Sequence, residues 1–170
     1  MISGQLEKQI CGLCEELKRK KRQSVPHGGR DHGGIMTEKE LNDLTGKIIG
    51  IAMDVHRELG PGLLEKVYQK CLKIALEDAG YNVQMELPLP VMFRGRMIDE
   101  AGYCIDLLVN DTIVLEIKST GELTPVFEKQ IGTYLRLADK PCGLLLNFNA
   151  VYLKQGIKRI KNGFLPSVRN

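Results

Sequence analysis

Apolar residues recur every three or four positions in two stretches near the start of the chain. The first stretch, residues 37–58, predicts an amphipathic helix. Thr37 and Glu40 have the reciprocal spacing of a helix-capping box, which places the start of this helix at Thr37. Helical spacing resumes after Gly60-Pro61-Gly62 and continues to Gly80. We expect this second helix to begin near Pro61, because proline suits the first turn of a helix.

After Gly80 the pattern becomes that of short strands, with one more helix between them. Prolines at 88 and 90 indicate an edge strand, because proline cannot donate to a neighbouring strand. Thr124-Pro125 opens a helix that runs to about residue 139, and a short amphipathic end follows around Ile157 and Ile160. This order predicts an α/β fold with a mixed sheet of four to five strands flanked by helices. The strands are expected at residues 82–93, 102–109, 113–118, 143–147 and 151–153.

Composition is that of a globular domain: 170 residues, of which 43% are hydrophobic and 26% charged. The chain contains no apolar run of membrane-spanning length, and its first twenty residues carry charges where a signal peptide needs apolar side chains. We therefore expect a cytoplasmic protein with no membrane contact. The five cysteines are an odd number and do not indicate a disulfide framework.

Residues 1–35 differ in character from the rest of the chain. They contain seven basic and four acidic residues and are rich in glycine, whereas residues 36–170 carry as many bases as acids. We predict a weakly helical, flexible extension before a domain at 36–170. Another interpretation is that residues 1–35 arise from an upstream start and are not made in the cell, because Met36 directly precedes the capping box. The C-terminal stretch is also basic, and its charges could form a local basic patch or belong to a solvated tail.

The extension also has the cysteine and histidine spacing of a zinc finger. The two cysteines are two residues apart and the two histidines follow. However, the segment lacks the apolar residues that form the small core of a finger, and glycine pairs interrupt the part that should be helical. We therefore do not expect zinc as a cofactor. A loose zinc site, or a zinc-dependent DNA-binding adaptor, would use Cys11, Cys14, His27 and His32.

The strand at 113–118 carries two charges among apolar residues. Side chains alternate along a strand, so Glu116 and Lys118 share one face, and burying them costs free energy unless a metal or partner charges compensate. A three-residue connection or a bulge after the preceding strand would set Asp106 opposite Glu116, and this is the register we predict. Two carboxylates, a main-chain carbonyl and waters suit Mg²⁺. An ordinary surface strand with cross-strand ion pairs is the alternative.

Two further motifs make this pattern more specific. Asp106 with Glu116-Ile117-Lys118 resembles the PD-(D/E)XK nuclease superfamily, although Ile105 stands where its name has proline. Residues 62–68 read G-L-L-E-K-V-Y and resemble more closely the small proteins named for a GxxExxY signature. Gln130 and Tyr134 are similar to the Q-x3-Y motif of RecB-like nucleases. The resemblance covers residues 37–162.

This resemblance implies a restriction-endonuclease-like fold and hydrolysis of phosphodiester bonds with Mg²⁺ or Mn²⁺. The substrate would be nucleic acid, DNA rather than RNA, with a homodimer or an accessory protein supplying specificity. A binding module without catalysis that keeps the nuclease fold is the alternative, favoured by the neutral charge of residues 36–170. Tyr134 could equally pack in the core with Gln130 at its rim, His56 is better interpreted as a structural histidine, and Glu65 could be an exposed helix residue. The implied metal ligands are Asp106, Glu116 and Glu65; Lys118 would activate water, Gln130 would assist, and Tyr134, Tyr68 and His56 would contact substrate.

Overall fold

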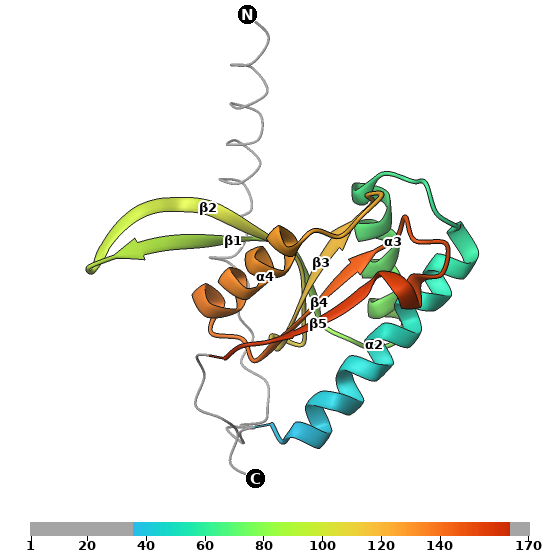
Figure 1. Ribbon diagram of the computed structural model, residues 1–170. Coiled ribbons are helices and arrows are strands. Elements are labelled where there is room, and N and C mark those ends of the chain that lie inside the picture. Colours follow the sequence, from blue (N-terminus) through green and yellow to red (C-terminus); the bar gives the residue numbers. More distant parts are fainter. Residues whose placement is uncertain (1–35, 164–170) are drawn as a thin grey trace, which may run out of the picture. The chain divides into compact units, whose positions relative to one another are not determined.

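The computed structural model describes residues 36–163 (Figure 1). Helix α2, Glu38–Leu59, begins at the predicted capping box: the Thr37 hydroxyl accepts from the Glu40 amide, and the Glu40 carboxylate accepts from the Thr37 amide. Helix α3, Glu65–Asp78, begins later than predicted, so the expected start near Pro61 is wrong. Gly60 and Gly62 adopt φ values of +68° and +101°, and these left-handed conformations keep the segment before Glu65 out of the helix.

Five strands form one mixed sheet in the order β1-β2-β3-β4-β5. The pairs β1–β2, β2–β3 and β4–β5 are antiparallel, whereas β3 and β4 are parallel and are joined through helix α4, Pro125–Ala138. The α/β class, the mixed sheet and the edge position of the proline-containing strand are confirmed. The strands are β1 Val83–Phe93, β2 Arg96–Val109, β3 Ile113–Lys118, β4 Cys142–Asn147 and β5 Ile157–Lys161.

The strand expected at 151–153 is absent from the described residues. Val151 and Tyr152 are exposed in a bend, while Leu153 is buried and opens the short 3-10 helix η1, Leu153–Gly156. The chain has to reverse here so that β5 can run antiparallel to β4. Gly156 permits this close reversal, since a Cβ at this position would lie 2.6 Å from the Asn147 carbonyl oxygen.

Helices cover both faces of the sheet (Figure 1). On one face, Ile48 of α2 and Leu72 of α3 belong to the same buried cluster as Leu115 and Ile117 of β3. On the other face, Ile131 of α4 belongs to a second cluster with other side chains of the sheet. Strands β3 and β4 are therefore buried from both sides, which explains their nearly continuous apolar sequence.

The β1–β2 hairpin extends well beyond the rest of the sheet (Figure 1). Its far end exposes large apolar side chains, and the Arg94 guanidinium lies 5.2 Å from the centre of the Phe93 ring. Within residues 36–163, none of the helices has the length and apolar character needed to cross a bilayer. The exposed apolar residues at the far end are Met92, Phe93, Met97 and Ile98.

Candidate active site

The connection between β2 and β3 sets the register of the candidate site. Pairing runs from Val109 opposite Ile113 to Leu107 opposite Leu115, so residues 110–112 form the predicted three-residue connection. Asn110 and Asp111 adopt φ values of +50° and +52° in this turn. Continued by one residue, the same register sets Asp106 opposite Glu116. The expected three-residue connection is confirmed, together with the register of the three pairs next to it.

Asp106 lies where backbone pairing between β2 and β3 stops. Its Oδ2 atom accepts a hydrogen bond from the Ile117 amide at 2.7 Å, so a side chain replaces the partner strand at this point. Burial raises the pKa of Asp106, while the Ile117 amide and the Lys118 charge oppose this effect. The carboxylate is thus held against β3 beside Glu116.

Glu116 is almost completely buried, with 2% of its surface exposed. Its Oε1 accepts from Lys118 Nζ at 2.7 Å, whereas the buried Oε2 has no hydrogen-bond partner. Burial and the neighbouring Asp106 charge raise the pKa of Glu116 to about 7, against the opposing effect of Lys118. A buried carboxylate oxygen without a donor is costly, and a bound cation would remove this cost.

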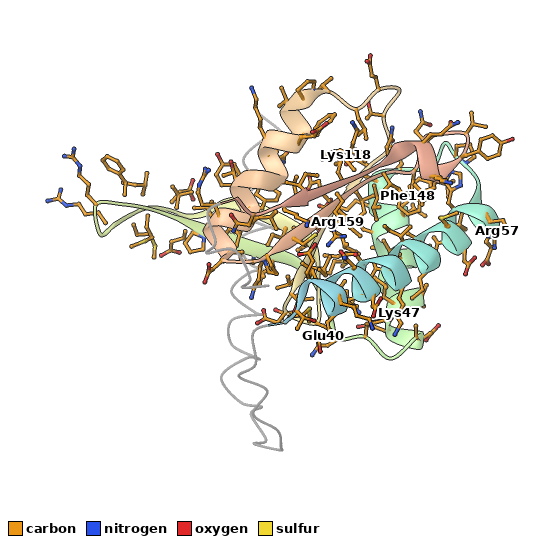
Figure 2. The ribbon with its side chains drawn as sticks, turned by 60° about the horizontal axis from the view of Figure 1, so that its bottom comes forward. Glu40, Lys47, Arg57, Lys118, Phe148 and Arg159 are labelled. Atoms are coloured by element: carbon orange, nitrogen blue, oxygen red, sulfur yellow. The ribbon has the colours of Figure 1, made fainter. Side chains whose placement is uncertain are left out.

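Lys118 remains an ammonium at neutral pH. Burial lowers its pKa, but the hydrogen bond to Glu116 and the charges of Glu116, Glu65 and Asp106 outweigh burial, so the pKa is raised. Its Nζ lies 5.2 Å from the centre of the Phe127 ring of α4. Figure 2 shows Lys118 at the same end of the sheet as Phe148, whose amide donates to the Lys118 carbonyl oxygen at 2.8 Å. Lys118 can therefore stabilise negative charge and orient water rather than act as a neutral base.

Glu65 is the first residue of α3, and it lies near enough to Asp106 and Glu116 for its charge to affect them. Its Oε1 accepts from the Ser119 amide at 3.2 Å, and its charge contributes to the raised pKa values of Asp106 and Glu116. Ser119 Oγ in turn donates to the Leu63 carbonyl oxygen at 2.7 Å. The turn before α3 and the segment after β3 are thereby tied together beside the site.

The carboxylates do not form a complete set of metal ligands in their present arrangement. Among residues 36–163, no three His, Cys, Asp or Glu side chains converge closely enough to bind one ion. Asp106 and Glu116 alone still suit Mg²⁺, which commonly keeps several waters and takes only one or two protein carboxylates. The unpaired Glu116 Oε2 supports this fit.

Gln130 and Tyr134 lie on α4 at the border of the site. Gln130 Nε2 donates to the Tyr134 hydroxyl, and the Tyr134 ring packs against Tyr103 with centroids 5.6 Å apart. Burial raises the pKa of Tyr134, the Gln130 hydrogen bond opposes this effect, and the Glu116 charge adds to it. Tyr134 thus packs in the core while remaining within electrostatic range of Glu116.

Tyr68 and His56 lie outside the carboxylate cluster. Tyr68 is fully buried and stacks on Phe148, and its hydroxyl donates to the Gly60 carbonyl oxygen at 2.6 Å and accepts from the Leu63 amide at 3.1 Å. His56 Nε2 lies 2.9 Å from the Ala150 carbonyl oxygen. These contacts hold the turn before α3 and tie α2 to the segment after β4. The four zinc candidates, Cys11, Cys14, His27 and His32, lie outside the described residues.

Two supporting residues escaped the sequence analysis. One is Ser119, which binds Glu65 and Leu63, and the other is the buried Asn147 at the end of β4, which holds the segment that follows Lys118. Asn147 Oδ1 accepts from the Thr120 amide at 3.1 Å, and its Nδ2 donates to the Thr120 carbonyl oxygen at 2.8 Å. A polar residue closing an apolar strand is the only sequence signal that could have identified Asn147.

Comparison with known proteins identifies a family. Residues 42–160 match a family described as the PD-(D/E)XK nuclease superfamily. The matched segment contains Glu65, Asp106, Glu116, Lys118 and Gln130. No curated protein and no solved structure shows a significant match.

Proposed function

The chain belongs to the PD-(D/E)XK nuclease superfamily, and from this premise we propose that it is a metal-dependent nuclease that hydrolyses phosphodiester bonds of nucleic acid. The observation that carries the proposal is Glu116: a buried carboxylate with an unpaired oxygen, opposite Asp106 and hydrogen-bonded to Lys118. A purely structural role would not require this costly combination. The G-L-L-E-K-V-Y segment further supports a closer kinship with the GxxExxY proteins.

Asp106 and Glu116 would hold Mg²⁺ or Mn²⁺, with Glu65 as a further carboxylate nearby. A divalent cation bound there supplies an activated water and neutralises charge on the phosphate. Lys118 donates from a protonated Nζ to a phosphate oxygen or to the attacking water, and so stabilises the charge that develops. Gln130 and Tyr134 border the same space and would contact the nucleic-acid backbone.

The proposed substrate is DNA rather than RNA, and the proposed specificity partner is a second copy of the chain or an accessory protein. The exposed apolar end of the β1–β2 hairpin supports such a partner, because large apolar side chains clustered at a surface commonly mark protein contacts. Light scattering after size exclusion would test self-association. A monomer at all concentrations would leave only the accessory protein.

The function can be tested with labelled single- and double-stranded DNA and RNA in Mg²⁺, Mn²⁺ or EDTA. We expect cleavage in either metal, and loss of at least a hundredfold in rate on Asp106→Ala and on Lys118→Ala. Asp43→Ala and Lys73→Ala are matched controls, because Asp43 is exposed on α2 and Lys73 pairs with Glu77 on α3, outside the site. Cleavage that survives both site substitutions would remove the catalytic proposal.

A binding module that keeps the nuclease fold is the second candidate. The incomplete carboxylate set within the described residues favours it, as does the balance of charges over residues 36–170. A nuclease of this size without a strongly basic surface binds nucleic acid weakly through charge alone. Binding without cleavage in every metal would establish the module and overturn the enzyme.

A further inference from the structure

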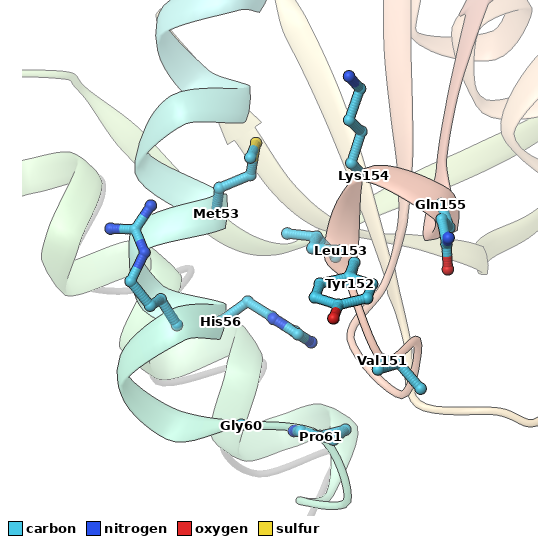
Figure 3. A pocket seen from close by; sticks show the side chains of 10 residues that line it. Met53, His56, Gly60, Pro61, Val151, Tyr152, Leu153, Lys154 and Gln155 are labelled. Carbon is cyan, nitrogen blue, oxygen red and sulfur yellow. The ribbon is translucent and has the colours of Figure 1, made fainter.

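A cavity of about 670 Å³ lies between the end of α2 and the segment after β4. In Figure 3, His56 projects from α2 towards Tyr152, and Leu153, Lys154 and Gln155 lie on the opposite wall. The volume falls in the range of small-molecule and cofactor pockets. The cavity shares no lining residue with the carboxylate cluster, and of its lining residues His56 alone has an expected contact with substrate.

The lining selects for a ligand with a flat ring and negative charge. Tyr152 leaves 68% of its surface exposed and can stack on a ring. Arg57 and Lys154 also line the cavity, whereas its lining residues include neither Asp nor Glu. The Arg57 charge is already paired with Asp54 at 2.6 Å, so Lys154 is the cation better able to bind an anion.

The basic residues of β5, which follow Lys154 in the chain, are engaged in ion pairs or hydrogen bonds. Lys158 pairs with Glu128, Lys161 pairs with Glu38, and the Arg159 guanidinium donates to the Asn42 side chain. Lys154 is exposed and makes no such contact within the described residues. A phosphate in the cavity would therefore find an ammonium that no carboxylate has neutralised.

One short turn connects this cavity to the carboxylate site. Gly60 and Pro61 form part of the cavity wall, and the same turn continues to Leu63, which binds Ser119 next to Lys118. The ends of β3 and β4 are joined as well, through the hydrogen bond between the Phe148 amide and the Lys118 carbonyl oxygen. Neighbouring strands lie roughly 5 Å apart. The carboxylate site and the cavity therefore both adjoin the end of the sheet where the parallel strands β3 and β4 finish.

We propose that the cavity binds an unpaired nucleotide of the substrate strand, with its base against Tyr152 and its phosphate at Lys154. This inference rests on the proposed nuclease function and adds a substrate class to it, namely single-stranded nucleic acid or the unpaired end of a duplex. A base within an intact duplex is already stacked and paired, so its faces are not available to Tyr152. Stacking on an aromatic side chain is tolerant of sequence, and the cavity would accept any base.

Binding can be measured by fluorescence polarisation with a labelled single-stranded oligodeoxynucleotide. An Asp106→Asn background prevents cleavage during the measurement. Tyr152→Ala should weaken binding at least fivefold, and Lys154→Ala should weaken it and reduce the slope of affinity against salt by about one. Ile74→Ala and Lys70→Ala are matched controls, because both residues are exposed on α3 and neither lines the cavity. Equal affinity of Tyr152→Ala and its parent would overturn the inference.

An oligonucleotide series with one base removed at successive positions tests the stacking itself. In the parent protein, one position should lose affinity when its base is absent, and in Tyr152→Ala this position should no longer matter. If affinity in Tyr152→Ala still falls when the base at this position is removed, the inference is overturned. The inference would also be overturned if Tyr152→Ala weakened the binding of free deoxyadenosine monophosphate but left the binding of the oligonucleotide unchanged.

The inference and the proposed function fail in different ways. If the wild-type chain cleaves nothing but still binds the oligonucleotide in a way that depends on Tyr152, the nuclease proposal fails and nucleotide binding in the cavity is supported. If wild type and Tyr152→Ala cleave single strands with the same KM and kcat in the presence of metal, the nuclease proposal is supported and nucleotide binding in the cavity is overturned.

Discussion

Replacing Glu116 by glutamine should stabilise the cation-free protein at neutral and alkaline pH. The wild-type carboxyl has an ordinary pKa of 4.5 when unfolded and a pKa of about 7 when folded, because it is buried beside Asp106. Between these two pH values the folded chain binds more protons than the unfolded chain, so its stability falls as pH rises. Glutamine has no proton to lose and escapes this penalty.

The two pKa values set the size of the effect. By proton linkage, the raised pKa of Glu116 lowers the free energy of unfolding by about 1 kcal/mol at pH 5 and by about 3 kcal/mol at pH 8. The attraction of Lys118 is already contained in the pKa of Glu116. Since the glutamine amide has to find a partner in a buried place, we expect a net gain of about 1–3 kcal/mol at pH 8.

Urea unfolding of both proteins in EDTA, at pH 5 and pH 8, measures this difference. The exposed residue Glu122 offers a control, and Glu122→Gln should leave the free energy of unfolding unchanged at both pH values. The reasoning is refuted if Glu116→Gln is less stable than wild type at pH 8. It is also refuted if its advantage does not shrink at pH 5.

Three further predictions concern the cation and the scaffold. Mg²⁺ or Mn²⁺ should raise the Tm of EDTA-treated protein more at pH 8 than at pH 6, because the cation competes with a proton for Glu116; equal thermal shifts would contradict this. Tyr68→Phe should lower the free energy of unfolding in urea by about 1–3 kcal/mol, since two buried hydrogen bonds are lost, and an unchanged value would refute their contribution. Gly143→Ala should cost about 1–3 kcal/mol, because its Cβ would lie 2.7 Å from Ile131 Cδ1. Gly132→Ala on α4 has open space and should instead gain about 0.5–1 kcal/mol; the opposite order in urea would contradict this packing.

Local signals in the sequence were sufficient for most of the fold. The capping box located α2, proline at the first turn located α4, and the short apolar run located β3 with its bounds unchanged. The errors arose where backbone turns override a favourable local pattern. Pro61 lies between two glycines with positive φ and so precedes α3 rather than opening it, and Tyr152 is exposed in a bend because the chain reverses towards β5.

The candidate site could be predicted only in part, because its supports come from distant parts of the chain. Alternation and the length of the β2–β3 connection were enough to set Asp106 opposite Glu116. The bond from the Ser119 amide to Glu65 spans 54 residues, and the bond from the Thr120 amide to Asn147 spans 27. No periodic pattern reports contacts of this kind, since they depend on how separate elements pack together.

The central claim is that Asp106 and Glu116 share one divalent cation, and anomalous diffraction from crystals grown with Mn²⁺ tests it most directly. We expect one strong peak within about 2.3 Å of an oxygen of each carboxylate, completed by waters. The peak should disappear in crystals of Glu116→Gln, whose fold should be unchanged. An anomalous map with no peak between these two carboxylates, or with the peak retained in Glu116→Gln, would contradict the account.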